Sequence, residues 1–150
     1  MQISRAGEYG VMGLMYLARR FPGRRTMIDE VSRHEGISKS FLAKIFQSLV
    51  RAGLVRSMRG AGGGFALAKN PDQIPVLDII EAVEGRIVFQ RCKMERPDCH
   101  HIGGCALCGL LERAQNGLKD VLTSTTLADL IQQREQQGKI EWSQSKARRN

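Results

Sequence analysis

GISKSFLAKIFQSLVRAG, residues 36–53, decides the fold. Its large apolar residues recur at helical spacing, which predicts a helix from about Ser38 to Ala52. This apolar stripe, which we expect to be buried, consists of Leu42, Ile45, Phe46 and Leu49. Gly53 ends the helix at the position where a left-handed residue is usual, and Gly36 suits a tight turn before it.

Two further helices are predicted upstream of this stretch. Residues 4–20 carry apolar side chains at helical spacing, and Pro22 follows them. Thr26-x-x-Asp29 resembles a capping box and predicts the start of a second, short helix. A short helix, a glycine turn and a helix with one polar face are typical of a helix-turn-helix.

Downstream, two short strands are predicted over Leu54–Met58 and Phe65–Ala68, around the glycine-rich stretch RGAGGG at 59–64. Leu77, Ile80 and Val83 then indicate a fourth helix that ends at Gly85. The fold class is therefore mainly α with a small β-hairpin wing. We expect a winged helix-turn-helix domain over residues 1–85, joined to a long dimerisation helix.

The rest of the chain divides into three parts. Residues 86–108 form a segment containing cysteines, and 105–136 hold the dimerisation helix and a short C-terminal helix that begins at Thr126-x-x-Asp129. We expect residues 137–150 to be a disordered polar tail. Apolar residues at alternating steps of four and three predict a coiled-coil-like seam: Leu107, Leu111, Ala114, Leu118, Val121 and Thr125. This seam favours a homodimer, and packing onto its own domain is the alternative.

The charge of the chain is concentrated in its first half. Residues 1–70 hold twelve Lys/Arg and four Asp/Glu, whereas 71–150 hold eleven of each, so the whole net charge of +8 lies before residue 71. A basic surface that is only solvated is one interpretation of this excess. Because the excess coincides with the helix-turn-helix, we favour the other, in which it binds double-stranded DNA. No stretch is long enough to cross a membrane, so we expect a cytoplasmic protein. We find no catalytic constellation, and expect neither an enzyme nor a small-molecule substrate.

The polar face of the 38–52 helix supplies the candidate DNA contacts, because the major groove admits one α-helix. Gln47 is placed to pair with adenine, and Arg51 to reach guanine or phosphate. Ser38, Lys39 and Ser40 lie at the helix N-terminus, which favours phosphate. Two arginines of the hairpin, Arg56 and Arg59, are placed to reach an adjacent phosphate or the minor groove. The glycine-rich loop lacks the GK[ST] of a phosphate-binding loop, so nucleotide binding is not expected.

Four cysteines occur with the spacing Cys92-x6-Cys99-x5-Cys105-x2-Cys108. Thiolates are the usual ligands of iron–sulfur clusters, and disulfides are rare in a reducing cytosol. A structural zinc site is one alternative, although only Cys105 and Cys108 have the spacing of a zinc knuckle. The other alternative is bare thiols that oxidise reversibly.

The turn-and-helix sequence of 36–42, Gly53-Leu54-Val55 and the RGxGGGFxL stretch of 59–67 resemble the Rrf2 family of winged-helix transcription regulators. The resemblance covers roughly residues 1–135. It implies a DNA-binding homodimer whose operator binding is controlled by a [2Fe-2S] or [4Fe-4S] cluster that senses iron, redox state or nitric oxide. It also implies a set of DNA contacts: Ser38, Ser40, Lys44, Gln47 and Arg59.

By the same resemblance, Cys92, Cys99 and Cys105 match the three loop cysteines of cluster-binding members of the family. Six residues separate the first two, where the family commonly has five. The fourth ligand stays open. Some members have a histidine at the position of Cys108, and others use an acidic residue of the other subunit near position 8, where this chain has Glu8. The neighbouring histidines, His100 and His101, are the third possibility.

Overall fold

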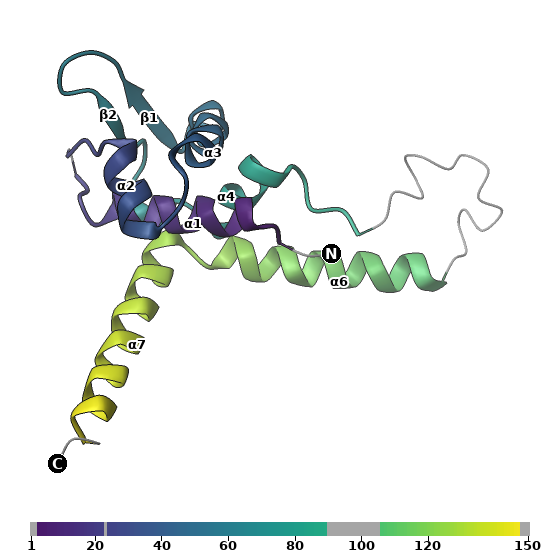
Figure 1. Ribbon diagram of the computed structural model, residues 1–150. Helices are drawn as coiled ribbons and strands as arrows, with labels where there is room; N and C mark the ends of the chain where they lie inside the picture. Colours follow the sequence, from purple (N-terminus) through teal and green to yellow (C-terminus); the bar gives the residue numbers. More distant parts are fainter. Residues whose placement is uncertain (1–2, 23, 90–105, 148–150) are drawn as a thin grey trace.

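The computed structural model describes residues 3–22, 24–89 and 106–147 (Figure 1). In chain order the elements are α1 (Arg5–Ala18), α2 (Ile28–Glu35), α3 (Lys39–Arg51), β1 (Val55–Met58), β2 (Gly64–Leu67), a short 3-10 helix η1 (Pro71–Gln73), α4 (Val76–Glu84), α6 (Ala106–Ser124) and α7 (Leu127–Ala147). The architecture is mainly helical with one antiparallel hairpin. The predicted winged helix-turn-helix fold is thus confirmed.

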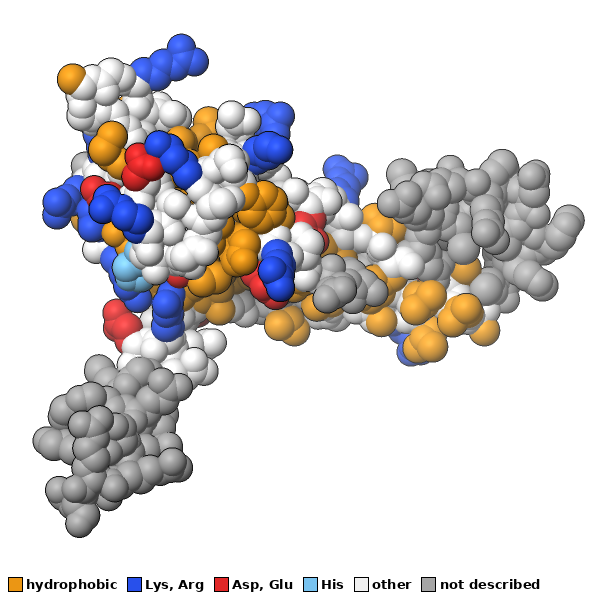
Figure 2. All heavy atoms as spheres, in the orientation of Figure 1, with side chains coloured by type: hydrophobic (Ala, Val, Ile, Leu, Met, Phe, Trp, Pro, Cys, Tyr) orange, Lys and Arg blue, Asp and Glu red, His pale blue; other side chains and the backbone are white. Residues whose placement is uncertain are grey.

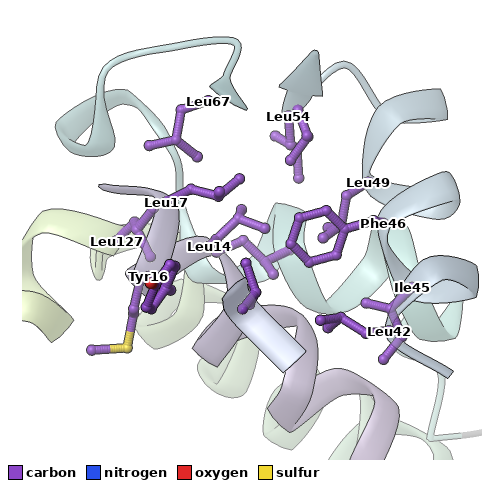
Figure 3. Packing of buried hydrophobic residues seen from close by; sticks show 14 of the residues in the cluster. Leu14, Tyr16, Leu17, Leu42, Ile45, Phe46, Leu49, Leu54, Leu67 and Leu127 are labelled. Atoms are coloured by element: carbon purple, nitrogen blue, oxygen red, sulfur yellow. The ribbon is translucent and has the colours of Figure 1, made fainter. Parts of the chain in front are cut away.

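The core lies where α1, α3 and α4 meet, and α3 buries the predicted stripe (Figure 3). Leu42, Phe46 and Leu49 of this stripe are fully buried, and Ile45 is 3% exposed. Helix α1 approaches α3 so closely that a Cβ atom added to Gly13 would lie 2.8 Å from the ring of Phe46. A glycine at this position therefore lets the two helices pack without a gap.

The turn between α2 and α3 is closed by local hydrogen bonds. Gly36 has φ 66°, in the left-handed region that favours glycine. The Ser32 hydroxyl donates to the Ile37 carbonyl at 2.6 Å, and the Ile37 amide donates to the Ser32 carbonyl at 3.1 Å. This turn holds α3 against α2, with the polar side of α3 away from the core.

The predicted capping box at the start of α2 is wrong. The residue before the helix is Met27, and no side chain caps it. Thr26 instead pairs with Phe65 of β2, through two backbone hydrogen bonds of 2.9 Å. This pairing buries the Thr26 side chain completely, and its hydroxyl has no hydrogen-bond partner among the described residues.

The hairpin pairs Val55 with Leu67 and Met58 with Gly64. Its strands begin and end within one residue of the predicted bounds. At the tip, Gly60 and Gly62 have φ of 91° and 75°, and the Gly63 amide donates to the Gly60 carbonyl at 2.8 Å. A side chain at these two left-handed positions would be strained, which explains the glycine-rich loop.

Helix α6 lies along α4 and buries part of its apolar surface there. Leu118 and Leu122 pack against a small cluster made of Val76, Ile80 and Ile87. The predicted seam is therefore wrong at Leu118, which faces its own domain. The seam's steps of three and four run along two neighbouring stripes of α6, and contact with α4 selects one of them. Other apolar residues of α6 are exposed: Leu110 (53%) and Val121 (61%) on the neighbouring stripe, and Leu107 (60%) near the start of the helix.

The junction of α6 and α7 is fixed to the domain. The Leu127 amide donates to the Ile74 carbonyl at 2.8 Å, and the Val76 amide donates to the Thr125 carbonyl at 2.9 Å. Leu127 itself is fully buried in the main core. These contacts anchor the C-terminal end of α6 beside the start of α4.

Helix α7 begins with the predicted capping box. The Thr126 amide and hydroxyl donate to the Asp129 carboxylate at 2.8 and 2.7 Å, and the Asp129 amide donates back to the hydroxyl at 3.2 Å. These hydrogen bonds lower the pKa of Asp129. The bond from the Thr126 amide has the larger effect, and the bond from its hydroxyl the smaller.

The structure continues α7 through Ala147, so residues 137–147 of the expected disordered tail are helical; residues 148–150 lie outside the described residues. The sequence of this part is rich in Gln, Glu, Lys and Arg, which are good helix formers, and one Gly138 costs only about 1 kcal/mol. Within the described part of the chain, no helix is long and apolar enough to cross a membrane.

Candidate nucleic-acid interface and cysteine segment

The outer side of α3 carries the residues predicted to contact DNA. Ser38 precedes the helix, and the others on α3 follow at steps that keep them on the side away from the core. The predicted residues of this helix are all exposed: Ser38, Lys39, Ser40, Lys44, Gln47 and Arg51. The local sequence explains this, because the four buried residues of α3 occupy the opposite side.

Two of these side chains are engaged within the chain. The Lys39 ammonium lies 2.8 Å from one oxygen of Asp29 and 3.0 Å from the other. Arg51 donates to the Ser48 hydroxyl at 3.1 Å. Lys39 must therefore share its charge between Asp29 and any phosphate, whereas no described residue pairs with Lys44 or Gln47. The sequence analysis missed the Asp29 contact because it assigned Asp29 to the capping box.

The hairpin adds the two predicted arginines, and both Arg56 and Arg59 are exposed. Figure 2 shows Lys and Arg side chains gathered around the hairpin, α2 and α3. A third arginine reaches the hairpin from outside it. Arg25 donates from Nη1 to the Gly62 carbonyl at 3.1 Å and is itself exposed. The run Arg24-Arg25 is visible in the sequence, but the contact is not, because it joins residues far apart in the chain.

The cysteine segment lies mostly outside the described residues. This applies to Cys92, Cys99 and Cys105, as well as to His100 and His101. Cys108 lies on the first turn of α6 and is half-buried, while Glu8 is exposed on the first turn of α1. Among residues 3–22, 24–89 and 106–147, no three His, Cys, Asp or Glu side chains form a metal-binding group. The four-cysteine ligand set therefore stays a prediction, which rests on the preference of iron–sulfur clusters for soft thiolate donors.

The segment that leads into the cysteines is attached to both neighbouring helices. The Ile87 amide donates to the Glu81 carboxylate of α4 at 3.1 Å, and the Phe89 amide donates to the Gln115 side chain of α6 at 2.9 Å. Lys119 of α6 lies 3.6 Å from the same Glu81 carboxylate. Residues 86–89 therefore connect the DNA-binding domain, α6 and the start of the cysteine segment. Sequence reasoning did not identify these contacts.

Comparison with known proteins agrees with this architecture. The family model Rrf2, described as an iron-dependent transcriptional regulator, matches residues 3–133. An HTH-type transcriptional regulator of Neisseria meningitidis is 34% identical over 134 residues, which cover 89% of this chain and 90% of that protein.

Solved structures extend the comparison. IscR of T. potens is 31% identical with a TM-score of 0.72, over 91% of this chain and 90% of that one. CymR, the global cysteine regulator of B. subtilis, is also 31% identical with a TM-score of 0.67, over 88% of this chain and 97% of that one. These relatives are regulators of transcription, not enzymes.

Proposed function

Since the chain belongs to the Rrf2 family of transcriptional regulators, we propose that it binds its operator as a homodimer under the control of a cysteine-ligated iron–sulfur cluster. The observation that carries the DNA part is the exposure of every predicted contact on α3 and the hairpin, in the half of the chain that holds the whole net charge. The observation that supports the sensor part is the set of four cysteines next to a segment bonded to both α4 and α6.

In this proposal α3 enters the major groove and the hairpin reaches the neighbouring backbone or minor groove. Lys44 and Gln47 have no partner among the described residues, so they meet the DNA without first losing a contact. Lys39 must give up part of its interaction with Asp29, and we expect it to contribute less. Base-edge contacts then specify the sequence, while the arginines and the serines of the helix N-terminus position the protein.

The exposed apolar side of α6 supports the dimer. Figure 2 shows apolar side chains along this helix. Leu107, Leu110 and Val121 are each more than half exposed in the single chain, which is unusual for large apolar residues on one side of a helix. A second copy of the same helix, related by a two-fold axis, covers these residues in both subunits at once. The two copies of α3 then face successive major grooves of a near-palindromic site.

Cys92, Cys99 and Cys105 would hold the cluster, with Cys108, Glu8 of the second subunit or a neighbouring histidine as the fourth ligand. When bound, the cluster would supply the sensing chemistry, because its occupancy or oxidation state changes with iron supply, oxidants or nitric oxide. The chain's own part is mechanical. Binding of the cluster by the cysteines would act on residues 86–89, where the Ile87 and Phe89 amides are held by Glu81 and Gln115. A shift there changes how α4 lies on α6, and hence the separation of the two copies of α3.

A second candidate mechanism is reversible oxidation of the thiols without a cluster. The similarity to CymR of Staphylococcus aureus, 30% identical to this chain, favours this alternative, because one of its solved structures is described as the oxidized form. Arg91, Lys93 and Arg96 lie close to the cysteines in sequence and would favour the reactive thiolate. A structural zinc site is the third outcome that the experiment must distinguish.

The test begins with anaerobic purification of the full chain, followed by visible absorption and assays for iron, sulfide and zinc. We expect a coloured protein with iron and sulfide; a colourless protein with zinc would refute the cluster. Cys92→Ala should remove the colour and leave a folded dimer. Cys108→Ala and Glu8→Gln, compared in the same assay, identify the fourth ligand by which of them alters the spectrum.

The DNA part is tested with duplexes selected from a random library by the cluster-loaded and the cluster-free protein. Arg59→Ala should weaken binding to the selected duplex and reduce the slope of log affinity against log salt by about 0.9. Unchanged affinity would show that the hairpin does not contact DNA. Equal affinity of the loaded, stripped and oxidised forms would refute control by the cysteines in any chemical form.

A further inference from the structure

The hairpin that carries Arg59 is held in place by a residue outside the helix-turn-helix motif. Arg25 donates from Nη1 to the carbonyl of Gly62 at 3.1 Å, across a large separation in sequence. Thr26, the next residue, pairs with Phe65 on the other side of the same loop through two hydrogen bonds of 2.9 Å. The segment before α2 thus contacts the hairpin at two points.

The contact at Gly62 affects Arg59 directly, because the tip is tightly folded. The neighbouring residue, Gly63, donates its amide to the Gly60 carbonyl at 2.8 Å. A Cβ atom added to Gly63 would lie 2.6 Å from the Met58 carbonyl oxygen and 3.3 Å from the carbonyl carbon of Arg59. A displacement of Gly62 is therefore passed to the backbone of Arg59 over two residues.

The compact glycine tip is not fixed relative to the rest of the domain by side chains of its own. Its residues carry no side chains that pack, and glycine has the largest backbone freedom of all residues. A two-stranded hairpin is also only marginally stable in isolation. An external contact is therefore needed to keep the tip in one position, and a guanidinium makes a stronger hydrogen bond to a carbonyl than a neutral donor does.

We propose that Arg25 is the positioning residue of the hairpin: it fixes the Gly62 carbonyl and thereby holds Arg59 where it reaches the DNA. The inference rests on the proposed role of Arg59 in operator binding. Arg25 acts through Arg59 and not as a separate phosphate contact. Its neighbour Arg24 carries the same charge and is exposed, but its side chain makes no hydrogen bond to the hairpin among the described residues, so it serves as the matched control.

The test is a double-mutant cycle on the full chain, with a duplex selected from a random library by the wild-type protein. Arg25→Ala should weaken binding roughly three- to tenfold, the range expected for losing one ordinary intramolecular hydrogen bond. In combination with Arg59→Ala, the loss should be no greater than that of Arg59→Ala alone. Arg25→Lys, which keeps a donor, should recover most of the affinity, and Arg24→Ala should cost less than Arg25→Ala.

Additive losses in the cycle would show that Arg25 contacts DNA independently and would overturn the proposal. Equal losses of affinity from Arg24→Ala and Arg25→Ala would show that Arg25 acts only through its charge, and this would also overturn the proposal. Hydrogen exchange without DNA separates this inference from the proposed function. Arg25→Ala should speed exchange of the Gly63 amide and leave the amides of α3 unchanged. Unchanged exchange at the hairpin refutes the positioning role, whereas a silent Arg59→Ala refutes the DNA contact on which it acts.

Discussion

Replacing Leu110 by glutamate tests whether the exposed side of α6 joins two copies of the chain. Leu110 is 53% exposed in the single chain, so about half of its side chain is available for burial in a dimer. Complete burial of a leucine contributes about 1.5–3 kcal/mol, and the remaining half therefore contributes about 0.8–1.6 kcal/mol per subunit. Because Leu110 of each subunit is buried in a two-fold dimer, the total is about 2–3 kcal/mol.

Loss of about 2–3 kcal/mol raises the dissociation constant of the dimer about 30- to 150-fold. This is a lower bound for Leu110→Glu, because the dimer would also bury a carboxylate from each subunit. The isolated domain should keep its fold, since Leu110 belongs to neither core cluster among the described residues. Circular dichroism and the unfolding temperature at high dilution check this point.

Sedimentation velocity over a range of concentrations measures the dissociation constant. Asn116→Glu provides the matched control, because it places the same acidic side chain at an exposed position on another side of the same helix. We expect Asn116→Glu to dimerise as the wild type does. If Leu110→Glu and the control have equal dissociation constants, α6 is not the dimer interface, and the proposed arrangement of the two copies of α3 fails with it.

The remaining predictions concern the fold. Gly13→Ala should lower the free energy of unfolding by about 1–2 kcal/mol in urea denaturation, because overpacking against the buried Phe46 outweighs the helix propensity gained; a more stable variant would show that the two helices can separate. Thr26→Val should raise the same free energy by about 1 kcal/mol, since it removes a buried hydroxyl without a partner among the described residues; a loss instead would indicate a partner for that hydroxyl. The lowered pKa of Asp129 stabilises the folded chain above the usual value of 3.8, and this contribution disappears as the pH falls through the folded value. Unfolding temperatures of Asp129→Asn and wild type should therefore converge in acid, and a constant difference between about pH 7 and about pH 2 would contradict the role of the Thr126 hydrogen bonds.

Local patterns predicted those parts of the fold that depend on neighbours in the sequence. The buried side of α3, the glycine-rich hairpin and the Thr126–Asp129 cap each follow from spacing and residue type over a few positions. The exposure of the residues predicted to contact DNA follows as well, because they are the complement of the buried side of α3.

Contacts between distant segments explain what the sequence did not predict. Thr26 has the pattern of a helix cap, but its pairing with Phe65 decides its conformation, and Asp29 is thereby left for Lys39. Leu110 and Leu118 both lie on apolar stripes of the same helix, and only the position of α4 determines which of them is covered. The hydrogen bond of Arg25 could not be predicted either, because its partner is a backbone carbonyl of a distant residue, which no sequence pattern marks.

The attachment of the α6–α7 junction to the start of α4 has a consequence for the choice of genomic site. In the proposed dimer each DNA-binding domain is fastened to its own copy of α6, so in each state of the cysteine segment the two copies of α3 lie a defined distance apart. The protein would then read the distance between half-sites as well as their bases. About five additional base pairs between them turn one half-site about half a helical turn around the duplex, out of reach of its subunit. Promoters with suitable half-sites at the wrong interval would be ignored.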